Sequence, residues 1–252
     1  MDLLISSATH RSGSTLIQRI FNARARTLIW GENGGCLTDY CHIYNNALHY
    51  SETFKDVRNA YFNEGQNPNQ WIACMTPRPE ILRKAVIQSI KTLNDQLYVD
   101  EHRDAFDMIG YKEVRYGKEE LELFRECYPG CPVILLIRHP VSVWKSVSPR
   151  AKKERYGSFQ GFSELWTNRV EEYLDLSAKD PDMHLIKYED VIAKETKTLD
   201  LIKSIGSLKD DEIEKVLAVR VSSSSKPIHR GVNKGILKLC ENTMIKAGYD
   251  VC

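Results

Sequence analysis

The sequence predicts an α/β fold of three layers, in which helices flank a central parallel sheet. Short runs with apolar cores, the clearest of them Val133–Ile137, alternate along the chain with segments of helical periodicity. Strands that are apolar throughout are buried on both faces, and strands joined through helices pair in parallel beneath them. The 252 residues, 1–252, are expected to form a single domain.

The N-terminus predicts a strand, a tight loop and a helix in immediate succession. The run Leu3–Ser7 is a short apolar strand, and the polar loop His10–Thr15 contains a glycine. Apolar residues then recur at helical spacing, namely Leu16, Ile17, Ile20 and Phe21. The first N–H groups of such a helix have no partner within the helix, so this junction attracts anions.

The remaining elements are predicted from the same patterns. A helix-rich segment runs from about Leu37 to Leu97, with breaks at Gly65–Pro68 and Thr76–Pro79. Strands are expected at Met108–Lys112, Val133–Ile137 and His184–Tyr188. Helices are expected at Glu119–Cys127, after Pro140, at Phe159–Ser177, at Val191–Ile205 and at Asp210–Val219. Residues 222–235 are expected to form a polar loop.

The first loop carries the donors that an oxyanion needs. Gly13 allows the backbone to approach an anion closely, and Ser12, Ser14 and Thr15 add hydroxyl groups. Arg11 adds a fixed positive charge on a planar fork of donors. A plain helix cap, with Ser or Thr at the N-cap position, would use the same residues.

The strand Val133–Ile137 ends in a cation, Arg138. The triphosphate-binding pattern GxxxxGK[ST] is missing, since the first loop has one glycine and no lysine before Ser14. A kinase or ATPase would also place an acidic metal ligand at a strand end. Arginine in that place favours an anion bound without a metal ion.

These residues resemble the family of sulfotransferases that depend on PAPS (3′-phosphoadenosine-5′-phosphosulfate). The family begins with a strand and a loop of the type [PY]-[KR]-S-G-[ST]-T, and the R-S-G-[ST]-T style is that of bacterial and tyrosylprotein-type members. Here His10 stands where proline is common. The resemblance implies that the 5′-phosphosulfate is bound by Arg11, Ser12, Gly13, Ser14, Thr15 and Leu16.

The family's second motif is a strand that ends in Arg, with a Ser eight residues later; Arg138 and Ser146 match it. The resemblance implies that these two residues bind the 3′-phosphate. From the residues alone, Ser142 is the alternative, because it lies nearer the start of the helix.

Two lesser matches extend the resemblance as far as Asp190, after which it thins. Gly110–Arg115 resembles the family's GFKE-type strand, and Lys187–Asp190 resembles its YED-type strand end, which adds Tyr188 to the expected cofactor-binding residues. The family also closes a late Arg/Lys-Gly loop over the nucleotide. Arg230 and Gly231 are its counterpart here, although a plain surface turn explains them equally well.

The family's chemistry assigns roles to three side chains. Sulfuryl transfer, by analogy with phosphoryl transfer, aligns acceptor and leaving oxygens and spreads negative charge that the protein must stabilise. Arg11 and Ser14 are expected to stabilise that charge. Glu32, in a Gly-rich segment after the first helix, is the expected general base, as in relatives with a similar loop. His10 is the rival base.

Composition narrows the partners and the compartment. A formal net charge of +1 argues against a nucleic-acid or anionic-membrane surface. No apolar stretch approaches the ~18 residues of a membrane span, and no signal peptide is expected. The seven cysteines form no CxxC pair, so we expect reduced thiols, no structural metal and a cytoplasmic location.

The expected function is sulfuryl transfer from PAPS, without a metal, to a hydroxyl or amine of a small-molecule acceptor, with PAP as the product. The acceptor site is expected around the helical segment 37–97. Two alternatives stay open: a P-loop kinase-like enzyme, and a non-catalytic protein that binds PAP or PAPS. The sequence does not indicate the acceptor or the oligomeric state.

Overall fold

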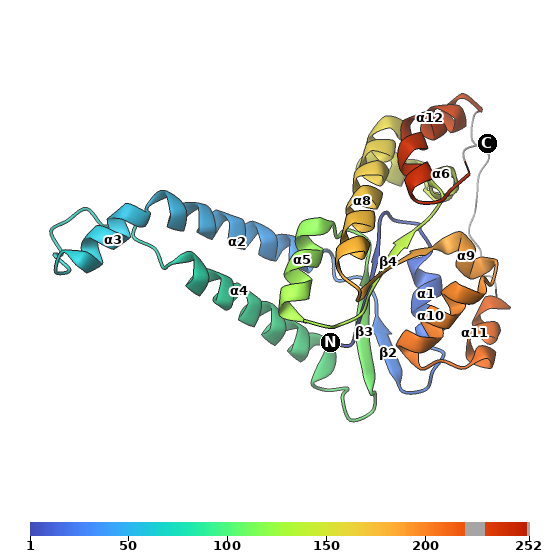
Figure 1. Cartoon of the computed structure of the whole chain (residues 1–252), viewed down its shortest axis with the longest axis horizontal. Coiled ribbons are helices and arrows are strands. Elements are labelled where there is room, and N and C mark those ends of the chain that lie inside the picture. The colour runs from blue at the N-terminus through green and yellow to red at the C-terminus, as the bar shows by residue number, and fades with distance from the viewer. Residues whose placement is uncertain (220–229, 251–252) are drawn as a thin grey trace.

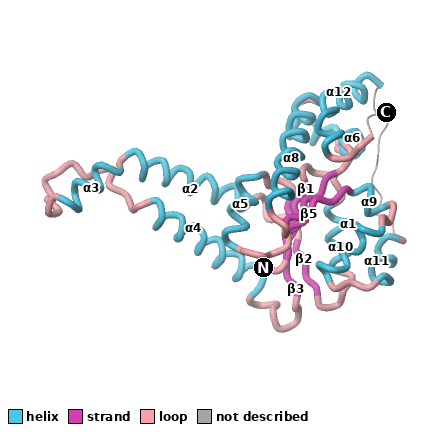
Figure 2. Tube along the Cα trace, in the orientation of Figure 1, coloured by secondary structure: helices cyan, strands magenta, loops and turns pink. Residues whose placement is uncertain are grey.

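The computed structural model describes residues 1–219 and 230–250. At its centre is a five-stranded parallel sheet in the order β2-β3-β1-β4-β5. Its strands are β1 (Leu3–Ser7), β2 (Thr27–Trp30), β3 (Met108–Glu113), β4 (Val133–Ile137) and β5 (Met183–Lys187). Helices lie on both sides of this sheet (Figures 1 and 2). The predicted α/β fold with a central parallel sheet is therefore confirmed.

Alternate residues of each strand enter different hydrophobic clusters, which separates the layers. Leu3 and Ile5 of β1 pack with α1 (Ser14–Phe21), α10 (Thr196–Gly206) and α11 (Asp210–Leu217). Leu4, between them, belongs to the opposite cluster, which contains residues of α5 (Lys118–Cys127), α8 (Phe159–Lys179) and α12 (Arg230–Lys246). This alternation is the expected consequence of burying both faces of a pleated sheet.

The helix-rich middle of the chain forms an arm that projects from the sheet (Figure 1). It contains α2 (Cys36–Thr53), α3 (Lys55–Asn63) and α4 (Pro79–Asn94), followed by a π-helical segment, Asp95–Val99. The helical prediction for this segment and its two breaks agree with the structure. Four short elements lie elsewhere, namely α6 (Pro140–Ser146), α7 (Pro149–Ala151), a π-helical segment at Lys152–Tyr156, and α9 (Tyr188–Ile192).

The structure differs from the sequence analysis in four places. Thr27–Trp30, for which no element was predicted, forms β2 at the sheet edge. Tyr188 begins α9 and does not end a strand. The helix expected at Val191–Ile205 is divided into α9 and α10, because Lys194 between them has a φ of 57°.

The fourth correction concerns the loop expected at 222–235. Arg230 is the first residue of α12 and Gly231 the second, so residues 230–235 are helical. The start of the helix was missed because its buried positions, such as Ile236 and Cys240, begin only after its first turn. Residues 222–229 of the expected loop lie outside the described residues.

Because all five strands are parallel, their carboxyl ends lie along one edge of the sheet. The central strand β1 has β3 on one side and β4 on the other, and the chain connections diverge from it. In such sheets, ligands bind outside the carboxyl ends at the point where the strand order reverses. The loop after β1, with those after its neighbours β3 and β4 on either side, therefore lies where a ligand is expected.

Candidate functional site

The loop after β1 leads into α1 through Gly13, which occupies the N-cap with φ 100° and ψ 12°. No side chain of the described residues caps this helix end. A Cβ atom at residue 13 would lie 2.2 Å from Cδ2 of Tyr188, so the ring packs directly on the glycine. The glycine is thus required both by its left-handed backbone and by the close approach of Tyr188.

Hydrogen bonds inside the loop hold its shape. The Ser12 hydroxyl donates to the Thr9 carbonyl at 2.8 Å and lies 3.0 Å from the Thr9 hydroxyl. Arg11 adopts φ 70°, in the left-handed region that costs a non-glycine residue roughly 1–2 kcal/mol. Ser12 is therefore a brace of the loop, while the exposed Thr15 and the buried Ser14 follow at the helix start.

The structure brings the two predicted phosphate motifs into contact through Arg138. Its Nη1 donates to the Arg11 carbonyl at 3.0 Å, which holds the strained Arg11 backbone. Its guanidinium carbon lies 4.2 Å from the centre of the Tyr188 ring, and Nε is buried without a hydrogen-bond partner in the described part of the chain. Arg138, Tyr188 and Gly13 thus form one stack that joins β4, α9 and the start of α1.

The other predicted nucleotide residues occupy helix ends. Ser146 is the last residue of α6, and its hydroxyl donates to the Val143 carbonyl at 3.0 Å. Ser142 lies in the first turn of the same helix. Arg230 and Gly231 begin α12.

Glu32 lies just after β2 and faces two cations from the end of β3. Lys112 Nζ is 2.6 Å from its Oε1, and Arg115 Nη1 is 3.3 Å from its Oε2. Burial disfavours the carboxylate, but the hydrogen bond and charge of Lys112 outweigh it, so the pKa of Glu32 is lowered. The Glu32 side chain is 34% exposed, so it is both ionised and accessible.

Glu113 holds the segment that presents Glu32. Its fully buried carboxylate accepts hydrogen bonds from the backbone N–H of Gly35 at 2.9 Å and of Asn33 at 3.2 Å. It also pairs with Arg115. Glu113 was not among the predicted site residues. The signal that could have found it is the run of alternating charges at the end of an otherwise apolar strand.

His10 lies within the electrostatic influence of Glu32, Lys112, Arg115 and Arg155. Burial, followed by the charge of Arg155, lowers the pKa of His10 to about 4. Its Nε2 is buried and finds no hydrogen-bond partner among residues 1–219 and 230–250. The two candidate bases are therefore neighbours, one an anion and the other a neutral imidazole at neutral pH.

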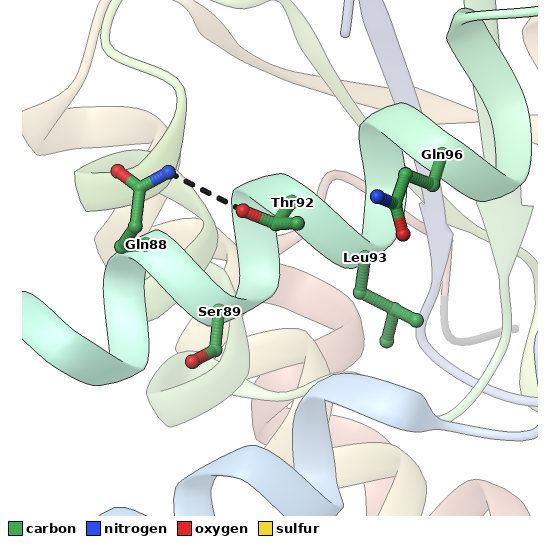
Figure 3. A pocket seen from close by; sticks show the side chains of 5 residues that line it. All are labelled: Gln88, Ser89, Thr92, Leu93 and Gln96. Carbon is green, nitrogen blue, oxygen red and sulfur yellow. Dashed lines mark hydrogen bonds between the residues drawn. The ribbon is translucent and has the colours of Figure 1, made fainter.

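Other features of the surface lie away from these loops. A shallow pocket is lined by Gln88, Ser89, Thr92, Leu93 and Gln96 on α4 and the π-helical turn after it (Figure 3). None of the predicted site residues lines this pocket.

In the described part of the chain, no three His, Cys, Asp or Glu side chains gather as metal ligands would. Among the same residues, no helix combines the length and apolar character needed to cross a bilayer.

Comparison with solved structures identifies the class of the fold. The chain is similar to the sulfotransferase domain from the curacin biosynthetic pathway, with a TM-score of 0.54 and 16% identity over 99% of this chain and 98% of that one. It is similar to the same degree to the sulfotransferase domain of the Synechococcus PCC 7002 olefin synthase, with a TM-score of 0.53 and 16% identity over 99% and 94% of the two chains. The fold is therefore that of a sulfotransferase.

A family model described as the sulfotransferase family matches residues 7–205. This match covers most of the chain, and the protein belongs to the sulfotransferase family. No protein among curated sequences matches it.

Proposed function

We propose that this protein transfers a sulfuryl group from PAPS to a hydroxyl or amine of a small-molecule acceptor, within a single domain spanning 1–252. The contact of Arg138 with Arg11 and Tyr188 carries the proposal. It places a cation of the second motif directly against the loop of the first, as a donor with phosphate groups at two positions requires.

Two observations support the binding of an anion by the proposed donor-binding residues. The start of α1 has no side-chain cap from the described residues, so its N–H groups and those of the loop, with the Arg11 and Ser14 side chains, are suited to the 5′-phosphosulfate. Arg138 Nε is buried without a partner in the described chain and is suited to the 3′-phosphate. The further members of the proposed set are Ser12, Gly13, Thr15, Leu16, Ser146, Tyr188, Arg230 and Gly231.

PAPS supplies an activated sulfuryl group, and the chain's own residues handle charge and protons. Arg11 stabilises charge without donating a proton, because a guanidinium stays protonated. Glu32 accepts the acceptor's proton, and its lowered pKa keeps it ionised for that purpose. The same shift makes Glu32 a weaker base, because a lower pKa means a lower affinity for the proton. Lys112 thus keeps Glu32 ionised at the cost of some basicity.

The acceptor is proposed to approach Glu32 from the side of the arm. Glu32 lies shortly before Cys36, the first residue of α2 and of the arm. Trp30, just before Glu32, donates from Nε1 to the carbonyl of Tyr98 at 3.3 Å, and Tyr98 lies in the segment that follows α4 at the other end of the arm. This hydrogen bond therefore joins the chain that enters the arm to the chain that leaves it. A cytoplasmic small molecule is the acceptor class we propose.

The donor is tested by calorimetry with PAP and, separately, with ADP and magnesium, on the wild type and on Arg138→Ala. We expect PAP to bind in the micromolar range or tighter without metal, and Arg138→Ala to weaken it by about tenfold to a hundredfold, as loss of a charged hydrogen-bond partner does. Magnesium-dependent binding of ADP with no affinity for PAP would overturn the proposal in favour of a kinase-like enzyme.

A further inference from the structure

Glu189 connects three segments that are far apart in the sequence. Its Oε1 accepts a hydrogen bond from the backbone N–H of His139 at 3.1 Å. Its Oε2 accepts one from the hydroxyl of Tyr249 at 3.1 Å. We infer that Glu189 and Tyr249 are positioning residues for Arg138, although neither belongs to the proposed donor site. This inference rests on the proposed role of Arg138 in donor binding.

The main chain around Arg138 is held from both sides. Trp166 Nε1 of α8 donates to the Arg138 carbonyl at 2.9 Å, and Glu189 accepts from the next N–H, that of His139. The peptide bond between residues 138 and 139 therefore has both of its polar groups fixed by side chains. Since Tyr188 lies under the guanidinium, the first turn of α9 supports Arg138 at its side chain and at its backbone.

Tyr249 completes this support from the C-terminal end of the described chain. Its ring meets that of His139 edge-on, with 5.6 Å between centroids, and lies 6.5 Å from that of Trp166. Lys187 Nζ donates to the Gly248 carbonyl at 3.2 Å and stands over the Tyr249 ring at 5.6 Å. Burial and the carboxylate of Glu189 raise the pKa of Tyr249, so its hydroxyl stays a neutral donor.

Both ends of α12 lie next to residues of the proposed nucleotide site. Arg230 and Gly231, which are proposed donor-binding residues, begin this helix, and Tyr249 lies three residues after its last residue, Lys246. Through Glu189, the segment after α12 reaches the loop that carries Arg138. We therefore expect donor affinity to depend on a hydroxyl group at residue 249, which belongs to no motif of the sequence.

A purely structural role for Glu189 makes a different prediction. A carboxylate in the first turn of a helix stabilises that helix by itself, and its loss lowers stability without a specific effect on the nucleotide. The two roles are separated by the coupling between Glu189 and Arg138 in nucleotide binding, measured as a double-mutant cycle.

The experiment measures PAP affinity by calorimetry and unfolding by urea for Glu189→Gln, Tyr249→Phe, Arg138→Ala and the double variant Arg138→Ala/Glu189→Gln. Glu171→Gln is the matched control, because Glu171 of α8 accepts from Thr243 and Lys246 of α12 and so tethers the same helix through other residues. We expect Glu189→Gln and Tyr249→Phe each to weaken PAP binding by about threefold to tenfold, the worth of one net hydrogen bond. Glu171→Gln should leave PAP affinity unchanged.

In the Arg138→Ala background, Glu189→Gln should have no further effect on PAP affinity. An equal effect in both backgrounds, or wild-type affinity in Glu189→Gln and Tyr249→Phe, overturns the inference. If Glu189→Gln does not fold, Tyr249→Phe tests the positioning role instead, since it removes a single hydroxyl.

Arg138→Ala alone tests the proposed donor site: if it binds PAP as the wild type does, the proposed function has failed at that residue. If only Arg138→Ala weakens binding, the positioning role alone has failed.

Discussion

Lys112 and Glu32, 80 residues apart in the sequence, form an ion pair of 2.6 Å at the carboxyl ends of two adjacent strands. The parallel register pairs Trp30 of β2 with Tyr111 of β3, so the residues just beyond each of them are brought together. The Lys112 side chain is only 8% exposed, whereas that of Glu32 is 34% exposed. The cation is thus part of the protein interior, and the carboxylate is left accessible from outside.

Replacing Lys112 by Met should shift the pH dependence of sulfuryl transfer. The Lys112 contact lowers the pKa of Glu32, so the ionised base persists to lower pH in the wild type. Without Lys112, the effect of burial is opposed mainly by the charge of Arg115, so the pKa of Glu32 should rise and the acidic limb of the kcat/KM profile should move to higher pH. Lys179→Met, which removes an exposed lysine paired with Asp175, is the control. An acidic limb that stays in place would show that Lys112 does not set the ionisation of the base.

Glu32→Gln should lower kcat by about a hundredfold to ten-thousandfold, the usual contribution of a general base, and keep PAP affinity. The assay follows sulfuryl transfer from labelled PAPS to a panel of phenols, amines and sugars, with PAP binding measured in parallel. His10→Gln is the comparison, since His10 is the other base within reach. Unchanged turnover in Glu32→Gln together with loss in His10→Gln would assign the base to His10.

Gly13→Ala should damage both stability and donor binding. The added Cβ would lie 2.2 Å from Tyr188, on a backbone of φ 100°. Gly130→Ala is the matched control, because Gly130 has φ 75° but no described atom within 4 Å of its Cβ position. Urea unfolding should show a loss of roughly 1–2 kcal/mol for Gly130→Ala, from backbone strain alone.

The loss of stability in Gly13→Ala should be larger than in the control, and PAP binding should weaken by at least about tenfold, or 1.4 kcal/mol, in this variant only. Equal stability losses and unchanged PAP affinity would mean that the contact between Gly13 and Tyr188 is dispensable.

Stability should fall as the pH drops from the ordinary pKa of His10, 6.5, toward its lowered value of about 4. In that window the unfolded chain binds a proton at residue 10 that the folded protein excludes, so protonation favours unfolding. His10→Gln should flatten this part of the curve of unfolding free energy against pH. His42→Gln, on the exposed surface of α2, should leave the slope as in the wild type. Identical slopes in all three proteins would contradict the burial of His10.

Local pattern predicted the strands and helices that carry enough apolar residues to be recognised alone. The apolar runs Leu3–Ser7 and Val133–Ile137 form central strands with the predicted bounds. Thr27–Trp30 was not recognised as a strand, because a strand of four residues at a sheet edge is defined by its neighbour β3 more than by its own pattern. Tyr188 was predicted as the last residue of a strand, but β5 ends one residue earlier, at Lys187. The end of β5 depends on where its pairing with β4 stops.

By itself, the sequence determined the strand–loop–helix unit around Gly13, the cation after β4 and the family resemblance that follows from them. These features are local: each depends on a few consecutive residues whose backbone preferences and charges can be read directly. Only the tertiary structure decided that Arg138 contacts Arg11, that Lys112 forms an ion pair with Glu32, and that Tyr249 donates to Glu189. Each of these contacts joins residues 60 or more positions apart. Their distance in space is set by strand order, register and helix packing, which no short pattern specifies.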